Sequence, residues 1–263
     1  SYRYIKVDGK DYRYRTNLKT ILFLGIDTTD ETKNQGQSDA IDLAIFDRDQ
    51  QKIKIISLSR DTMCKIRLFD SEGNDLGWDK QHLGLAYSYG KNRKHGGILA
   101  KDAVSKLLSD VPLVNYTAFD LNSLQELQDI IGDMPMVLDD DYIDINPLWK
   151  KGKKIVINRD NVEEFVRSRN TSKDYSNKTR MQRQKLYIQT YINQLKTQLT
   201  NDYSTTLQKM YNFYSKLTTN ITLKEIDSYA EMILNYSIDN NEYYTLPGED
   251  QKGSGDTEEQ SEE

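Results

Sequence analysis

Cysteine and histidine are scarce in this chain of 263 residues, and each shortage excludes a class of site. Cys64 is the single cysteine, which excludes an internal disulfide and a multi-cysteine zinc site, and a lone cysteine is more often a small buried residue than a nucleophile. The two histidines, His82 and His95, are too few for a histidine-rich metal centre. Disulfide scaffolds and common zinc sites are therefore excluded.

Long apolar runs are also missing. The longest uninterrupted run spans residues 21–26, far below the roughly 20 residues that a membrane helix needs. No signal peptide is recognisable. The chain begins at Ser1 rather than Met, and we expect any targeting segment to lie outside this sequence.

An excess of basic charge is the third absence. The formal net charge is −5, but residues 249–263 hold seven acids and only one base, Lys252. Removing them from 36 Lys and Arg and 41 Asp and Glu leaves 35 and 34, so residues 1–248 carry about +1. We expect 249–263 to be a disordered acidic tail, because like charge with Gly, Ser and Gln cannot form a core. A neutral body without a basic stripe argues against a nucleic-acid surface, and hence against a transcriptional regulator.

What is present is typical of a globular protein, with 37% hydrophobic and 29% charged residues. Residues 1–19 are polar and rich in tyrosine and predict a peripheral hairpin or arm. The remaining ordered length suits one large domain or two small ones. Apolar runs predict strands at 21–26, 40–47, 52–58, 114–121, 136–138, 152–157 and 243–248. Apolar residues three or four apart predict helices at 97–108, 124–131, 160–169, from 179 onward, 207–217 and 222–234.

This order of elements predicts the fold class and the loops. Strands and helices alternate, which favours an α/β fold with one three-layer domain and a sheet buried on both faces. Residues 61–96 are mixed and predict a long functional loop region, with a second polar loop at 170–179. Thr222 and Glu225 predict a capping box at the start of the last helix.

No standard enzyme motif occurs, but charged residues follow the expected ends of strands and helices. Asp27 ends the first buried strand, Asp39 opens the second, and Arg60 follows the third. Four further arginines flank the polar loop at 170–179, namely Arg167, Arg169, Arg180 and Arg183. Positions three apart on a helix share a face, so Arg180 and Arg183 are expected to point the same way, with Gln184 beside them. Ligands of α/β sheets bind at strand ends.

Two interpretations of these residues stay open at this point. Taken singly, an arginine is more often a surface residue, and Asp27 and Asp39 fit turn or cap positions. Taken together, five arginines around two carboxylates call for an anion such as a pyrophosphate to balance their charge. Arginine binds phosphate in a bidentate manner, and two carboxylates with phosphate oxygens suit Mg²⁺.

Six segments that contain these residues resemble the LytR–CpsA–Psr family of cell-wall glycopolymer ligases, in the family's order. They are Leu22-Phe23-Leu24-Gly25-Ile26-Asp27, Gln37-Ser38-Asp39, Ile56-Ser57-Leu58-Ser59-Arg60-Asp61-Thr62, Leu85-Ala86-Tyr87-Ser88-Tyr89-Gly90, Phe165-Val166-Arg167-Ser168-Arg169 and Arg180-Met181-Gln182-Arg183-Gln184. They cover about residues 20–200. The resemblance places the family domain at 20–248, between the N-terminal arm and the acidic tail.

The resemblance implies a three-layer α/β/α fold with a central mixed sheet and a hydrophobic lipid-binding groove. It implies a phosphotransferase that moves a glycopolymer, such as a teichoic acid or a capsule, from polyprenyl pyrophosphate to peptidoglycan and releases polyprenyl phosphate. Family members are usually anchored by an N-terminal membrane helix, with this domain on the extracellular face of the bacterial membrane. By analogy, Asp27 and Asp39 hold Mg²⁺. Asp39 also has a catalytic role with the arginines that neutralise the pyrophosphate, and these are Arg60, Arg167, Arg169 and Arg180.

Further substrate-binding residues follow from the same motifs, and three of them depart from the family pattern. Arg183 and Gln184 match the family. Gln37 stands where the family usually has Arg, His82 where it has Lys, and Asn177 where it often has Asp. These substitutions leave open a second reading, a degenerate member that binds polyprenyl (pyro)phosphate without efficient transfer. The sequence does not choose between Asp27 and Asp39 as the group that assists deprotonation of the acceptor hydroxyl.

Overall fold

The structure is a computed structural model, and it describes residues 2–15, 17–29, 35–239 and 242–246. A six-stranded mixed sheet forms its centre, in the order β11-β8-β3-β4-β5-β12. These strands are β3 (Leu18–Asp27), β4 (Gln37–Asp47), β5 (Lys52–Leu58), β8 (Asn115–Asp120), β11 (Leu217–Thr219) and β12 (Tyr243–Thr245). The pairs β3–β8 and β5–β12 are parallel, and the other neighbours are antiparallel.

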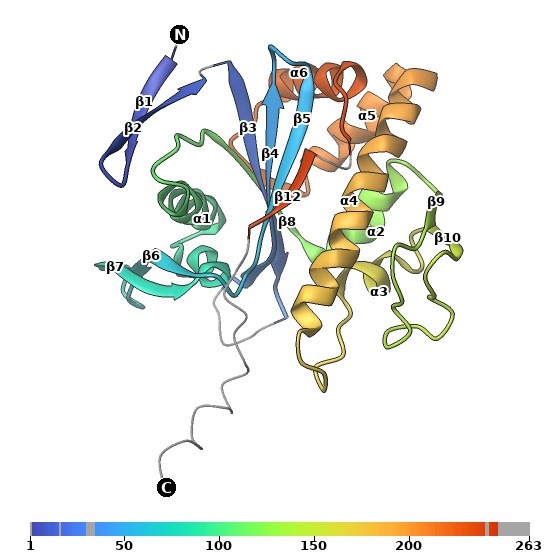
Figure 1. Cartoon of the computed structure of the whole chain (residues 1–263), viewed down its shortest axis with the longest axis horizontal. Coiled ribbons are helices and arrows are strands. Elements are labelled where there is room, and N and C mark those ends of the chain that lie inside the picture. Colours follow the sequence, from blue (N-terminus) through green and yellow to red (C-terminus); the bar gives the residue numbers. More distant parts are fainter. Residues whose placement is uncertain (1, 16, 30–34, 240–241, 247–263) are drawn as a thin grey trace, which may run out of the picture.

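One face of the sheet packs against α1 (Arg93–Leu107), the 3₁₀ helix η1 (Leu83–Tyr89) and a two-stranded sheet. That small sheet is the hairpin of β6 (Met63–Phe69) and β7 (Asp75–His82). Leu22 and Leu43 of the sheet pack with Ala103 and Val104 of α1, and all four are buried. Figure 1 shows α1 on one side of the central strands and the long helix α4 on the other.

The opposite face carries the remaining helices (Figure 1). They are η2 (Leu121–Ser123), α2 (Leu124–Asp129), α3 (Val162–Arg167), α4 (Ser176–Asn201), α5 (Tyr203–Tyr214) and α6 (Leu223–Asn235). The short strands β9 (Met134–Val137) and β10 (Lys154–Ile157) pair beside α4. Apolar residues at both odd and even positions of β3 and β4 explain this arrangement, because a strand covered on both faces needs apolar side chains on both. The expected three-layer α/β fold with a central mixed sheet is confirmed.

Local signals explain where several elements begin and end. Thr222 and Glu225 form the expected capping box of α6. Gly132 has a φ of 70° and follows α2, where its N–H bonds the carbonyl of Gln128. The predicted hairpin at 1–19 is present as β1 (Tyr2–Val7) and β2 (Lys10–Arg15). The expected tail at 249–263 lies outside the described residues.

Two expectations are wrong. Residues 61–96 are not a long loop, because they form β6, β7, η1 and the first turn of α1. Polar residues interrupt the apolar ones along β6, and β7 ends in four consecutive polar residues, so no continuous apolar run marks these strands. The helix expected at 207–217 begins earlier, at Tyr203, and its predicted last residue, Leu217, belongs to β11. Among the described helices, none is both long and apolar enough to cross a membrane.

Candidate active site

A β-bulge in the central sheet places Asp39. Gly25 pairs with Ala40 and Ile26 pairs with Ser38, so Asp39 is the extra residue of β4 at this point. A bulge turns the chain locally and changes the direction of a side chain. Here the bulge lets the carboxylate of Asp39 meet an arginine of α4, which covers the face of the sheet toward which Ala40 points.

Two arginines neutralise Asp39. Arg60 Nη1 forms an ion pair with Asp39 Oδ1, and Arg180 Nη1 lies 3.5 Å from Asp39 Oδ2. The side chains of Asp39 and Arg180 are only 7% and 6% exposed. Burial raises the pKa of Asp39, and the negative charge of Asp27 adds to this, while Arg60 and Arg180 oppose it. Asp39, Arg60 and Arg180 therefore form a buried, preorganised charge cluster rather than a solvated surface contact.

The helix η1 holds the backbone of the segment that carries Arg60. The N–H of Gly84 bonds the carbonyl of Arg60 at 2.9 Å, and the N–H of Leu83 bonds the carbonyl of Thr62 at 2.8 Å. A Cβ on Gly84 would lie 2.8 Å from the carbonyl oxygen of Ser38, so only glycine lets η1 approach this closely. The start of η1, just before the matched segment 85–90, thus contributes to the site through its backbone.

Asp27 and Arg167 form the second ion pair, at the end of β3. Arg167 Nη2 lies 3.4 Å from Asp27 Oδ1, and Arg167 Nη1 donates to Asn122 Oδ1 at 2.8 Å. Thr29 also donates to Asp27 Oδ1, from its N–H at 2.9 Å and from its hydroxyl at 2.5 Å. Burial acts to raise the pKa of Asp27, but the hydrogen bonds from Thr29 and the charge of Arg167 lower it overall. Asp27 therefore stays ionised near neutral pH.

Asn177 links two charged residues of the cluster, Arg180 and Asp61. Its Oδ1 accepts a hydrogen bond from Arg180 Nη2 at 3.0 Å, and its Nδ2 donates to Asp61 Oδ2 at 3.1 Å. Arg169 Nε donates to Ser176 Oγ at 3.0 Å, which ties the end of α3 to the start of α4. Asn177, which departs from the family pattern, is thus part of the hydrogen-bond network of the site.

Gln37 and His82 also contact the cluster. Gln37 Oε1 accepts a hydrogen bond from Arg60 Nη2 at 2.8 Å. An arginine at position 37 could not accept this bond and would repel Arg60. His82 lies at the end of β7 with Nδ1 3.1 Å from the carbonyl oxygen of Asp61, so its ring is held at the rim of the site.

Arg183 and Gln184 bind backbone carbonyls of the segment 165–168. Arg183 is 0% exposed, and its guanidinium donates to the carbonyls of Phe165 and Ser168. Gln184 is buried and donates to the carbonyl of Val166 at 3.1 Å. Both side chains therefore hold the segment that carries Arg167 and Arg169. Arg183 does not share the ion-pair network of Arg180, although the two residues lie three apart on α4.

Sequence reasoning missed three members of the site, which are Asn122, Thr29 and the side chain of Asp61. Asp61 had a signal, because it lies in the segment 56–62 that resembles the family. Asn122 and Thr29 had none, because their role depends on where β8 and β3 end relative to α3.

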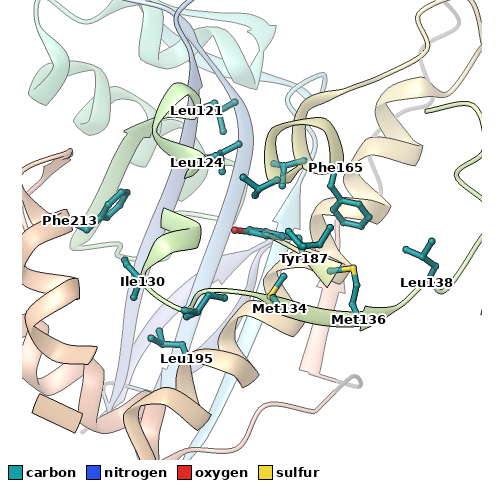
Figure 2. Packing of buried hydrophobic residues seen from close by; sticks show 14 of the residues in the cluster. Leu121, Leu124, Ile130, Met134, Met136, Leu138, Phe165, Tyr187, Leu195 and Phe213 are labelled. Carbon is teal, nitrogen blue, oxygen red and sulfur yellow. The ribbon is translucent and has the colours of Figure 1, made fainter. Parts of the chain in front are cut away.

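An apolar cavity of about 300 Å³ opens beside the charged cluster, between the sheet and the helices α2, α4, α5 and α6. Gly25 and Ala40 line it, and they are close neighbours in sequence of Asp27 and Asp39. Gln184 and Val166 also line it, so the wall continues to the segment that carries Arg167. Figure 2 labels six further lining residues, Leu121, Leu124, Ile130, Tyr187, Leu195 and Phe213. The helix face at Leu124–Ile131 thus faces the cavity, whereas the face at Leu99–Leu107 packs on the other side of the sheet.

The residues present fit a magnesium ion only together with a substrate. Within the described residues, no three His, Cys, Asp or Glu side chains form a metal-binding group. Asp27 and Asp39 supply two carboxylates, and Mg²⁺ is commonly held by one or two carboxylates, substrate phosphates and waters. The negative charge of Asp27 raises the pKa of Asp39, and a cation held between the two would relieve this repulsion. The donor set therefore suits Mg²⁺ that arrives with a phosphate group.

The sequence model of the LytR_cpsA_psr family matches residues 3–262, which is nearly the whole chain. The chain belongs to the LytR_cpsA_psr family. This membership confirms the resemblance of the six segments and supports a role in cell-wall glycopolymer transfer in general. No curated protein matches the sequence.

Solved structures share the fold of this LytR_cpsA_psr protein at low sequence identity. Protein gbs0355 from Streptococcus agalactiae is 22% identical with a TM-score of 0.70, and the match covers 91% of this chain and 80% of that one. TagV of B. subtilis is 19% identical with a TM-score of 0.67, with 89% and 85% covered. TagT bound to LIIa-WTA is 20% identical with a TM-score of 0.63, with 88% and 78% covered. These structures support the α/β architecture.

Proposed function

We propose that this protein transfers a glycopolymer from polyprenyl pyrophosphate to a hydroxyl of peptidoglycan and releases polyprenyl phosphate. The observation that carries the proposal is the continuity of the arginine cluster with the apolar cavity. Gln184 and Val166 line the cavity and hold the segment of Arg167, while Ala40 lines it next to Asp39. A ligand that fits both parts has an anionic head and a long apolar tail. TagT bound to LIIa-WTA, a similar structure, supports a lipid-linked glycopolymer as this ligand.

The arginines supply most of the chemistry that phosphoryl transfer needs, which is charge neutralisation and alignment. Arg60 and Arg180 are held on Asp39, and Arg167 is held on Asp27 and Asn122, before any substrate arrives. Preorganised cations stabilise the negative charge that develops on the bridging oxygen as polyprenyl phosphate leaves. Arg169 is exposed, and its charge acts on Arg180, so it can contact the pyrophosphate from the solvent side.

Mg²⁺ is the proposed cofactor, with Asp27 and Asp39 as its protein ligands. When bound, the ion would neutralise phosphate oxygens and polarise the phosphorus that is attacked. Asp27 suits this role because its lowered pKa keeps it ionised.

The proposed location is the extracellular face of a bacterial membrane, where polyprenyl-linked glycopolymers and peptidoglycan meet. An anchor preceding the domain would hold the cavity close to the lipid. The polymer is proposed to be a teichoic acid, a capsule or a similar polymer.

A transfer assay tests the proposal. The donor is a polyprenyl-pyrophosphate-linked glycan, the acceptor is a peptidoglycan oligomer, and Mg²⁺ is varied. We expect transfer by the wild-type protein and its loss in Asp39→Ala and Arg60→Ala, since both change the buried ion pair. Binding of the donor without any transfer would instead identify a carrier of polyprenyl phosphates. Absence of binding would refute the proposal.

A further inference from the structure

Three carboxylates border the arginine cluster, and they differ in how far their charge is already satisfied. Asp39 has one arginine on each oxygen and is almost fully buried. Asp27 Oδ1 receives two hydrogen bonds from Thr29 and an ion pair from Arg167, and its pKa is lowered. A carboxylate whose pKa is lowered by such contacts is a weak proton acceptor.

Asp61 is the third carboxylate, and its surroundings are different. Its side chain is 42% exposed, against 7% for Asp39 and 21% for Asp27. Oδ2 accepts the hydrogen bond from Asn177, whereas Oδ1 lies 3.7 Å from Arg60 Nε, beyond hydrogen-bond distance. Asp61 thus combines access from solvent with one oxygen that is only loosely held.

The charged and titratable groups around Asp61 come from three elements. Arg60 precedes it in the chain, Arg180 reaches it electrostatically from α4, and His82 contacts its carbonyl oxygen from β7. Arg60 and Arg180 are the same arginines that hold Asp39. A phosphate group bound to these two arginines would therefore lie next to Asp61.

We propose that Asp61 is the catalytic base that accepts the proton of the incoming peptidoglycan hydroxyl. This inference rests on the proposed transferase function. The hydroxyl oxygen forms a bond to the phosphorus that carries the glycopolymer, and its proton passes to Asp61 Oδ1. The bond from that phosphorus to the bridging oxygen breaks, and its electron pair leaves with polyprenyl phosphate. The base then returns the proton to solvent, to which it is open.

Asn177 is the positioning residue for this base. Its amide donates to Asp61 and accepts from Arg180, which fixes Oδ2 of the carboxylate, while Oδ1 lies 3.7 Å from Arg60 Nε. An aspartate at 177 would lose the donor and place a second negative charge beside Asp61. The neutral amide therefore suits a base at position 61 in this chain.

The experiment compares Asp61→Asn with the wild-type protein in the transfer assay and in direct binding of polyprenyl pyrophosphate. We expect kcat to fall at least about 100-fold, the usual contribution of a general base, while the affinity for polyprenyl pyrophosphate changes less than about threefold. Asp61→Glu keeps a carboxylate and should retain part of the rate. Asp129→Asn is the matched control, because Asp129 is a half-exposed aspartate that pairs with Arg159 at 3.2 Å, outside the cluster. It should keep the wild-type kcat.

Asn177→Asp gives a second readout that a structural role would not move. It should lower kcat while it leaves the affinity for polyprenyl pyrophosphate within about threefold of the wild-type value, because it removes the amide that holds Asp61 Oδ2.

The contrary outcomes distinguish failure of the assigned base from failure of the transferase function. A kcat of Asp61→Asn within threefold of wild type would overturn the assignment of the base alone. So would a loss of affinity equal to the loss of rate, which would make Asp61 a binding residue. A wild-type protein that neither binds nor transfers the lipid-linked glycan would remove the transferase function and this inference with it.

Discussion

Arg167 and Arg169 lie two residues apart, yet they are fixed by different partners. Arg167 bridges Asp27 and Asn122, whereas Arg169 is held by Ser176 and is exposed. Position in the chain predicted that both arginines approach a phosphate. The partners were not predictable, because they come from segments 45 and 140 residues away for Arg167.

Alanine at either arginine should weaken binding of polyprenyl pyrophosphate. We expect a loss of roughly 1.5–3 kcal/mol for Arg167→Ala and for Arg169→Ala, the usual value of a hydrogen bond to a charged group. Titration calorimetry of each variant in detergent measures the change. Arg159→Ala is the control, since Arg159 pairs with Asp129 at the surface. Unchanged affinity in both site variants would show that these arginines do not contact the ligand.

Asp42 is a carboxyl group in the wall of the apolar cavity, and no sequence motif marked it. Burial raises its pKa to about 6, although hydrogen bonds from Ser57 Oγ at 2.6 Å and Tyr243 OH at 3.3 Å oppose the shift. An acid whose pKa is raised in the folded state binds more protons there than in the unfolded chain. The free energy of unfolding should therefore fall as pH rises from about 4 to about 6, and stay constant above that range.

Asn at position 42 should remove this penalty. We expect Asp42→Asn to raise the free energy of unfolding by up to about 3 kcal/mol at pH 7.5, since about two pKa units correspond to that energy. The gain should be much smaller at pH 4.5, where the carboxyl is already protonated in the folded state. Urea unfolding at both pH values measures it, with the exposed Asp133→Asn as control. An equal effect at both pH values would contradict a buried titrating group.

At the scale of elements, the sequence predicts the central strands well because each is an apolar run between turns. The same reasoning fails for β6 and β7, whose charged residues face solvent, and for β11, whose three residues form a strand only because the edge of β8 is there to pair with. The ion pairs at Asp39 depend on the bulge in β4, which no local sequence pattern predicts. A hydrophobic lipid-binding groove was implied by family resemblance alone. The shape of the observed cavity depends on how four helices pack against the sheet, which no local pattern predicts.

Filling the cavity should separate lipid binding from stability. Ala44 of β4 lines the cavity, so Ala44→Phe places a ring in open space. We expect the affinity for polyprenyl pyrophosphate to fall at least tenfold while the free energy of unfolding is kept. Ala118→Phe is the contrast, because Ala118 is buried in the core on the opposite face of the sheet and overpacking there typically costs about 1–3 kcal/mol. Displacement of a fluorescent lipid and urea unfolding give the two values. Wild-type affinity in Ala44→Phe would place the lipid elsewhere.

At the scale of the whole molecule, the net charge of −5 does not describe the site. The whole excess of acid lies in residues 249–263, while the body is close to neutral. Within that body, Arg60, Arg167 and Arg180 face Asp27 and Asp39, and the apolar cavity begins where these pairs end. A strongly polar and a strongly apolar site are therefore adjacent, which is the requirement for an amphiphilic ligand.

One ligand that spans both parts predicts additive effects. Ala44 pairs with Ile21 of β3, which is six residues from Asp27, the partner of Arg167. This is roughly 20 Å at the rise of an extended strand, so the two ends of the site are far enough apart to act independently. The double variant Arg167→Ala/Ala44→Phe should then lose the sum of the two single losses of binding free energy, within about 0.5 kcal/mol. The same calorimetric titration measures all three variants. If head and tail sites took separate molecules, binding of a soluble pyrophosphate would be as tight as that of the polyprenyl form, and Ala44→Phe would leave the Arg167→Ala affinity unchanged.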